Sequence, residues 1–273
     1  MSDGSPVTEG NPGGAGQTAP GQPPGAGEPA MVAAGRAIVA TAAARSIPVR
    51  LVGGVAIYLR GSPPARAALG RSYPDIDLVA HKKQSRALRA VLEENGFEPE
   101  RVFNATHGAR RLLYHAPDGW QVDVFLDTFE MSHTLDLGRR LEAEPETLAA
   151  AELLLTKLQI AEVNQKDLSD TAMLLWDHQP GRQDGPGLLN VTAVTDRCAA
   201  DWGLHTTVTD NLAACAGLLG ELVATPADRD RIAARIGQLS QALDDAPKSM
   251  GWKARARVGR RMRWYQLPEE VTR

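Results

Sequence analysis

The chain lacks most of what marks secreted, membrane-spanning or strongly basic proteins. Its 273 residues include two cysteines, Cys198 and Cys215, too few for a disulfide scaffold or a cysteine-built zinc site. No apolar run approaches the roughly 18 residues of a membrane span. The 30 Lys and Arg nearly balance the 33 Asp and Glu, so bulk charge does not favour a nucleic-acid protein, although a local basic patch is still open. We expect a cytoplasmic protein with no membrane partner.

The first 30 residues lack the material for a hydrophobic core. They contain 8 Gly and 6 Pro with polar residues between them, a composition that cannot offset the entropy lost on ordering. The segment has neither a positive n-region nor an apolar h-region, so it does not read as a secretory signal peptide. We predict a disordered tail over 1–30, an α/β domain over 31–145 and a helical domain over 146–273.

Beyond the tail, hydrophobic periodicity and turn residues predict alternating helices and strands. The turn Pro117-Asp118-Gly119 predicts that its flanking strands pair as an antiparallel hairpin, and Gly61-Ser62-Pro63-Pro64 predicts a loop. The fold class is therefore α+β, a small mixed sheet flanked by helices and followed by a helical domain. The predicted strands are 49–52, 75–80, 110–115 and 120–126, and the predicted helices are 31–45, 55–60, 82–95, 148–163, 167–176, 206–223, 228–243 and 248–265.

Three motifs on these strands could carry chemistry. Gly53-Gly54 follows the first strand, so its backbone could approach a phosphate closely beside a helix N-terminus. Asp75 and Asp77 are two apart on a strand and point to the same face. Asp123, on the last strand, could join them. Carboxylates gathered on one face favour Mg²⁺ or Mn²⁺, and a metal beside a phosphate cradle indicates nucleotide chemistry.

Each motif also has an ordinary explanation. A diglycine is most often a turn, and a D-x-D pair on a strand is most often two solvated carboxylates. The alternative to a nucleotide site is therefore a structural module with surface acids. The order of the motifs along the chain favours the nucleotide site, because each piece requires the others.

These motifs resemble the nucleotidyltransferase superfamily that includes DNA polymerase beta and the aminoglycoside nucleotidyltransferases. The matching residues are Leu51-Val52-Gly53-Gly54, Arg71-Ser72-Tyr73-Pro74-Asp75-Ile76-Asp77-Leu78 and Val122-Asp123-Val124. Within it, Lys157-Leu158 and Lys166-Asp167-Leu168-Ser169-Asp170 resemble the later helix motifs of the AbiEii/AbiGii toxin type. The resemblance covers about 49–176. The chain departs from the family in lacking a Ser after the first Gly, and in the 20 residues between Gly54 and Asp75, which indicate an inserted loop.

The resemblance implies a polymerase beta-like fold and magnesium-dependent transfer of a nucleoside monophosphate from an NTP to a hydroxyl acceptor, with release of pyrophosphate. Acceptors would be a tRNA, a protein or a small molecule, and an antitoxin protein is a further partner that the toxin branch suggests. The alternative on the same fold is a non-catalytic nucleotide- or RNA-binding protein. By resemblance the catalytic and metal-binding residues are Asp75, Asp77 and Asp123, and the nucleotide-binding residues are Gly53, Gly54, Arg71 and Lys157.

Two charged segments remain open to a structural or a functional interpretation. On a helix, Lys166, Asp167 and Asp170 are neighbours, which fits surface ion pairing with a helix cap at Asp167 or a functional motif. Between 248 and 263 the chain has seven cations and no acid. A continuous helix there would carry a stripe that is either a solvated face or a site for RNA or another polyanion, and the stripe comprises Lys253, Arg257, Arg260 and Arg261.

Overall fold

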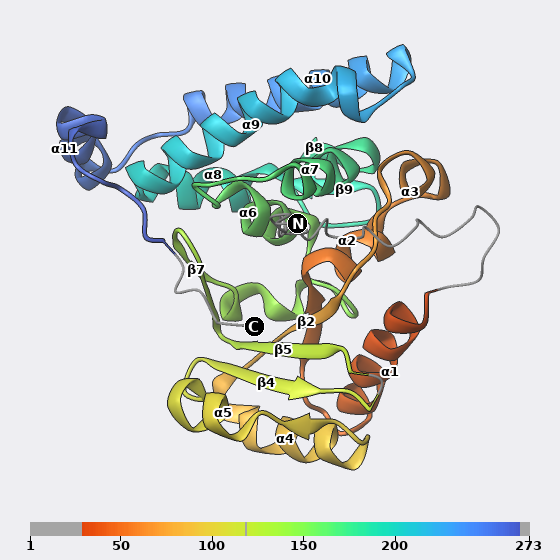
Figure 1. The fold of residues 1–273 in the computed structure, drawn as a ribbon. Coiled ribbons are helices and arrows are strands. Elements are labelled where there is room, and N and C mark those ends of the chain that lie inside the picture. The colour runs from red at the N-terminus through yellow and green to blue at the C-terminus, as the bar shows by residue number, and fades with distance from the viewer. Residues whose placement is uncertain (1–28, 118, 268–273) are drawn as a thin grey trace, which may run out of the picture.

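The structure is a computed structural model that describes residues 29–117 and 119–267. The predicted tail lies outside the described residues except for Pro29 and Ala30, and Ala30 already belongs to the first helix. Figure 1 shows the strands of the sheet in one layer, with helices α6 to α10 stacked on one side of it and α4 and α5 on the other. The α+β fold class predicted from the sequence is confirmed.

A five-stranded mixed sheet has the order β1-β2-β5-β4-β3. Strands β2 and β5 are parallel and the other neighbours are antiparallel, so the predicted hairpin of β4 and β5 is confirmed. Inward side chains such as Leu51, Ile76 and Tyr114 are fully buried. The strands are β1 (Val49–Val52), β2 (Asp75–Ala80), β3 (Glu98–Pro99), β4 (Arg111–His115) and β5 (Gln121–Leu126).

Helices of the first half cover this sheet. Helix α1 packs on β1 and on α4, and α2 begins directly at the end of β1 and packs on β2. The helix α4 ends before Gly96, whose φ of +84° is the left-handed conformation that commonly follows the end of a helix. These helices are α1 (Ala30–Ala44), α2 (Gly53–Arg60), α3 (Pro63–Leu69), α4 (Ser85–Glu94) and α5 (Arg101–His107).

The second half is mainly helical and shares one hydrophobic core with the sheet. Leu51 accepts a backbone hydrogen bond from Leu148 at 2.9 Å, and its N–H donates to Glu146 at 3.0 Å, so the chain runs along β1 before entering this half. The division into two domains near residue 145 stays a prediction. The helices are α6 (Ala150–Leu158), α7 (Gln165–Asp177), α8 (Val191–Ala200), α9 (Trp202–Leu222), α10 (Pro226–Asp245) and α11 (Met250–Val258).

The loop predicted at 61–64 is wrong in its second half. Helix α3 begins at Pro63, with Ser62 as its N-cap, whose hydroxyl accepts from the Ala65 N–H at 3.4 Å. Proline is favoured in the first turn of a helix because its missing N–H would have no partner there. The sequence patterns also missed α5, α8 and two small two-stranded sheets, which pair β6 (Thr128–Glu130) with β7 (Thr134–Asp136) and β8 (Gln179–Gly181) with β9 (Leu188–Asn190).

The continuous helix predicted over 248–265 is also wrong. Helix α11 ends at Val258, and Gly259 follows with a φ of +61° and a ψ of −146°, a non-helical conformation that glycine adopts without strain. A short 3₁₀ turn over Gly259–Arg261 comes next. The predicted stripe of four cations therefore does not lie on one helix. Across the described ranges, we find no helix long and apolar enough to cross a membrane.

Candidate functional site

The register of the sheet brings the predicted acids to one edge. Asp77 pairs with Val52 of β1 on one side and with Asp123 of β5 on the other. Asp75, two residues earlier on β2, pairs with Gln121. Because Gly53 follows Val52, the diglycine and the start of α2 stand at the same edge as the carboxylates. The structure thus assembles these predicted residues, which are up to 70 residues apart in the sequence.

The diglycine has room for no side chain. Gly53 has a φ of +68°, and a Cβ built on it would lie 2.0 Å from Oδ2 of Asp77. A Cβ on Gly54 would lie 2.4 Å from the Tyr73 ring and 2.9 Å from Nη2 of Arg71. Both positions therefore require glycine, as the sequence indicated. The groups that approach the backbone here belong to the protein itself, and phosphate binding by the two glycines stays a prediction.

Asp123 is held by an arginine that the sequence analysis missed. Nε and Nη2 of Arg111 donate to the two carboxylate oxygens at 2.6 and 2.5 Å, and Asp123 is only 7% exposed. Arg111 lies on β4, two residues along from Leu113, the direct partner of Asp123. The predicted hairpin gave the pairing of the strands, but this diagonal contact depends on a register that an unknown turn length leaves open.

Asp77 carries the most perturbed carboxyl group of the site. Burial, together with the negative charges of Asp75 and Asp123, raises the pKa of Asp77 to about 8. Lys157 and Arg111 pull this pKa down more weakly. In the described part of the chain, no Lys or Arg nitrogen lies within 4 Å of the Asp77 carboxylate. None of the described cations therefore neutralises this carboxylate by direct contact when it ionises.

A second charged cluster lies behind the diglycine. Nζ of Lys157 on α6 lies 3.1 Å from Asp167 and 2.9 Å from Asp170, both on α7. Arg71, in the loop before β2, donates from Nε and Nη2 to the two oxygens of Asp170 at 3.1 and 2.7 Å. Burial works to lower the Lys157 pKa, but the charges of Asp170 and Asp167 outweigh it and hold the pKa above its usual value. We call these four residues the helix cluster.

The interpretation of Lys166, Asp167 and Asp170 as a surface ion-pair motif is wrong for the two acids. Asp170 is fully buried and Asp167 nearly so, while Lys166 is exposed and takes no part in the cluster. The cap of α7 is Asn164, whose side chain accepts from the Asp167 N–H at 3.1 Å. Asp167 is thus three residues inside the helix, where its side chain reaches Lys157. Arg71 is half-buried rather than solvated.

The two clusters differ in how their charged groups pair. We use strand cluster for Asp75, Asp77, Asp123 and Arg111. In the helix cluster, the two cations pair directly with both carboxylates. In the strand cluster, Arg111 pairs with Asp123, and no described Lys or Arg reaches Asp77. Within residues 29–117 and 119–267, no three His, Cys, Asp or Glu side chains are grouped so that they could hold a metal ion together, which agrees with Arg111 occupying the Asp123 carboxylate.

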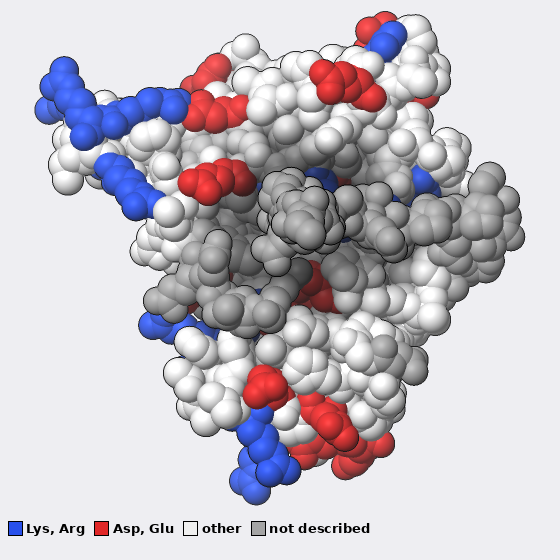
Figure 2. Space-filling view, in the orientation of Figure 1, with Lys and Arg blue, Asp and Glu red and all other residues white. Residues whose placement is uncertain are grey.

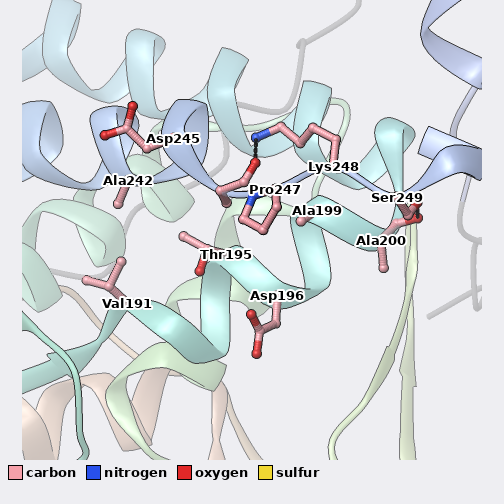
Figure 3. Close-up of a pocket in the computed structure, with 11 residues that line it drawn as sticks. Val191, Thr195, Asp196, Ala199, Ala200, Ala242, Asp245, Pro247, Lys248 and Ser249 are labelled. Atoms are coloured by element: carbon pink, nitrogen blue, oxygen red, sulfur yellow. Dashed lines mark hydrogen bonds between the residues drawn. The ribbon is translucent and has the colours of Figure 1, made fainter. Parts of the chain in front are cut away.

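Two cavities differ in their relation to this site. One of about 310 Å³ lies beside it, lined by the start of α1, by Arg71, Ser72 and Tyr73, and by Trp120. The other, of about 630 Å³, lies between α8, α10 and the loop 246–249 (Figure 3). Its walls are mostly Ala, Val, Thr and Pro, and its lysine, Lys248, donates to the Ala246 carbonyl at 3.0 Å. Its two carboxylates, Asp196 and Asp245, come from different helices, α8 and α10.

The predicted polyanion-binding residues are partly engaged within the chain. Arg260 donates to Asp210 of α9 at 2.7 Å and stacks over Trp264. Lys253, Arg257 and Arg261 are exposed and form no ion pair within 4 Å with any described residue. Figure 2 shows Lys and Arg side chains gathered at the α11 end of this face. Arg260 is exposed as well but is already paired with Asp210, and polyanion binding there stays a prediction.

Comparisons with known proteins give no family assignment. No family model and no curated protein matches the chain. Solved structures that resemble it include a lincomycin-bound lincosamide antibiotic adenylyltransferase, LnuA, at 12% identity and a TM-score of 0.36, covering 50% of this chain and 92% of that one. The antibiotic-resistance factor ANT(2'')-Ia is 14% identical with a TM-score of 0.37, covering 70% and 94%. An antigenic nucleotidyltransferase-like protein from Paracoccidioides brasiliensis is 15% identical with a TM-score of 0.39, covering 81% and 95%. Likenesses at this level carry no argument about function.

Proposed function

We propose that the chain is a divalent-metal-dependent nucleotidyltransferase that transfers a nucleoside monophosphate from an NTP to a hydroxyl acceptor. One observation carries the proposal. An excess of carboxylate charge, centred on Asp77, stands at the sheet edge directly beside a diglycine and the N-terminus of α2. Carboxylates attract a divalent cation, and free N–H groups at a helix start attract an anion. A metal-bound polyphosphate combines both partners in one molecule.

Asp75 and Asp77 fit a magnesium or manganese ion. Mg²⁺ is usually held by one or two protein carboxylates together with substrate phosphates, so a third free carboxylate is not required. Burial, together with the charges of Asp75 and Asp123, raises the pKa of Asp77 to about 8, and a divalent ion beside it would stabilise its ionised form. When bound, such an ion would polarise a phosphoryl oxygen and neutralise charge that develops during transfer.

The remaining residues of the site would orient the reactants. The backbone of Gly53 and Gly54 at the start of α2 would bind phosphate oxygens. Asp123, across the register from Asp77, would accept the hydrogen bond of the acceptor hydroxyl and help to deprotonate it. Since Arg71 and Lys157 are already matched by Asp167 and Asp170, we assign them to positioning the loop before β2 rather than to direct phosphate contact.

The cavity beside the site suits the base of the nucleotide. Its volume of about 310 Å³ lies at the lower end of the usual range for ligand pockets, which admits one ring system. The walls include the rings of Tyr73 and Trp120, and aromatic faces stack on nucleobases with little sequence preference. We expect Trp120 fluorescence to report NTP binding, and replacement of Trp120 by Leu to raise the KM for NTP more than it lowers kcat.

The acceptor is the open part of this proposal. Exposed cations at Lys253, Arg257 and Arg261 favour an RNA acceptor such as a tRNA over a small molecule, because they form no ion pair with the described residues around them. A protein hydroxyl and a small molecule stay alternatives. The toxin-type branch and an antitoxin partner also stay predictions, since no described contact bears on them.

A labelling experiment tests the proposal. The protein is incubated with each of the four alpha-labelled NTPs, Mg²⁺ and candidate RNA, protein and small-molecule acceptors, beside an Asp77→Ala variant. We expect label in one acceptor class and release of pyrophosphate, both lost in the variant.

A second candidate function is nucleotide binding without turnover, which the pairing of Asp123 with Arg111 favours. Binding of Mg-NTP by titration calorimetry with no pyrophosphate release would establish that second function instead.

A further inference from the structure

We propose that Tyr73 is a specificity-determining residue whose ring covers Gly54 until a nucleotide displaces it, so that the site excludes polyphosphates without a base. This inference rests on the phosphate site of the proposed function. It also gives a role to the 20 residues between Gly54 and Asp75, the inserted segment that the proposed reaction leaves unexplained.

The ring of Tyr73 lies directly on the start of α2. A Cβ added to Gly54 would lie 2.4 Å from Cδ1 of the ring, and Gly54 is buried. No side chain of the described residues caps this helix start, and the first N–H groups of a helix have no acceptor within the helix. An anion that is to reach the Gly54 N–H must therefore move the ring aside.

Contacts on both sides hold the ring over the glycine. The ring of Tyr58, on α2, meets it edge to face with 5.8 Å between the ring centres. The guanidinium of Arg71 lies 4.8 Å from the centre of the Tyr73 ring, and Asp170 of α7 fixes that guanidinium through two hydrogen bonds. Displacing the ring costs these contacts, so a ligand that offers only phosphate groups gains little by binding.

Tyr73 also lines the cavity of about 310 Å³ beside the site, together with Trp120. Residues 70–74 form neither helix nor strand, so their backbone has no helix or sheet hydrogen bonds to lose when the ring turns from Gly54 towards this cavity. A nucleotide can replace the contacts that it breaks, because its base stacks on aromatic rings. A ligand shifts an equilibrium only by its differential affinity for the two states, and here that requires both base and phosphates.

Binding of inorganic tripolyphosphate and of each of the four NTPs, measured by titration calorimetry at one fixed Mg²⁺ concentration, tests the proposal. In Tyr73→Ala, tripolyphosphate should bind about tenfold more tightly than in the wild type, because the covered state no longer reduces the population that can bind. The ratio of NTP affinity to tripolyphosphate affinity should fall by about fivefold or more, because stacking on the ring is lost. Unchanged tripolyphosphate affinity or an unchanged ratio in folded Tyr73→Ala would overturn the proposal.

Tyr73→Phe is the matched control. It keeps the ring and removes only the hydroxyl, which is buried and has no hydrogen-bond partner among the described residues. Both affinities should therefore match those of the wild type. If Tyr73→Phe binds tripolyphosphate as tightly as Tyr73→Ala does, the hydroxyl rather than the ring controls binding, and the proposal is wrong.

Two measurements on the wild-type chain keep the test decisive if Tyr73→Ala does not fold. The amides of Gly54 and Val55 lie in the first turn of α2, where a helix offers no acceptor, so slow hydrogen exchange there reports the cover. We expect slow exchange of both amides in the free protein and a higher affinity for at least one NTP than for tripolyphosphate. Exchange at the rate of an unstructured chain, or equal affinities, would contradict the cover.

These outcomes separate this inference from the proposed function. If label is transferred but Tyr73→Ala leaves the affinity ratio unchanged, the enzyme proposal stands and the role of Tyr73 fails. If NTPs bind with the expected ratios but no label is transferred, the role of Tyr73 stands and the enzyme proposal fails. If neither tripolyphosphate nor any NTP binds to the wild type or to the variants, the phosphate site itself is wrong, and both proposals fail together.

Discussion

The helix cluster and the strand cluster contain the same kinds of side chain but differ in balance. In the helix cluster, Lys157 and Arg71 meet Asp167 and Asp170 in direct pairs of 2.7 to 3.1 Å. In the strand cluster, Arg111 pairs with Asp123, while Asp77 faces two further acids. A balanced buried cluster needs nothing from outside, so it serves to hold loops and helices in register. An unbalanced one carries a charge that a ligand can neutralise, which is why perturbed carboxylates mark candidate sites.

Breaking the balance of the helix cluster should have the largest effect. Asp170→Ala would leave the buried Lys157 and the half-buried Arg71 with one carboxylate between them. Removing one partner of a buried ion pair typically costs about 3–5 kcal/mol, and we expect a loss of that order in the free energy of unfolding, measured in urea. The exposed neighbour Lys166→Ala should change it by less than about 0.5 kcal/mol. Equal stability of the two variants would show that the cluster is not structural.

Removing an acid from the strand cluster should have the opposite consequence for folding. The change relieves repulsion between carboxylates, so Asp75→Ala and Asp77→Ala should fold as well as the wild type while transfer falls by more than about a hundredfold. Incorporation of labelled nucleotide and thermal unfolding are measured on the same samples. Asp196→Ala, an exposed acid on α8, is the control. Near-native turnover of both variants at saturating Mg²⁺ would place the chemistry elsewhere.

How much the sequence predicts depends on the range of the forces involved. Local patterns were sufficient for β1, β2 and β5, because alternation and turn residues act within a few positions. They also named Asp75, Asp77 and Asp123, whose spacing on strands fixes their faces. Arg111 and the partners of Asp170 came only from the fold, since a diagonal contact and a contact between α6 and α7 depend on tertiary packing. The helix break at Gly259 had a local signal, the glycine itself, which the cationic pattern around it obscured.

The pH dependence of stability sharpens the comparison further. The Asp77 carboxyl has a pKa raised to about 8 in the folded protein, above its unfolded value near 4. The folded state therefore binds more protons between these values, and the free energy of unfolding falls as the pH rises through that window. In metal-free protein, Asp77→Asn should remove this fall. The free energy of unfolding of the variant, minus that of wild type, should therefore be larger at pH 8 than at pH 5, by about 1 kcal/mol or more.

Metal addition provides the control for that titration. At pH 8, Mn²⁺ should stabilise the wild-type chain and leave Asp77→Asn almost unchanged, because the variant lacks both the charge and a ligand. Denaturant midpoints at the two pH values, with and without Mn²⁺, give all four comparisons. Parallel pH profiles for wild type and variant would mean that Asp77 titrates normally and that the strand cluster is not electrostatically strained.

Excess charge also occurs at the surface, where it should have the smallest effect. Lys253, Arg257 and Arg261 are exposed, whereas Arg260 pairs with Asp210, so three cations rather than four are available to a polyanion. If the acceptor is RNA, replacing these three by Glu should weaken binding and lower the slope of log affinity against log salt by about 0.7–0.9 for each phosphate that is no longer neutralised. Solvated cations contribute little to folding, and NTP binding at the strand cluster should stay normal.

Filter binding at two salt concentrations measures the slope. Arg260→Gln is the matched control, since this substitution should cost only a surface ion pair worth at most about 1 kcal/mol. Equal affinity and equal slope for the triple variant and the wild type would remove RNA binding from this surface, and retained transfer activity in the same variant would point to a small-molecule acceptor.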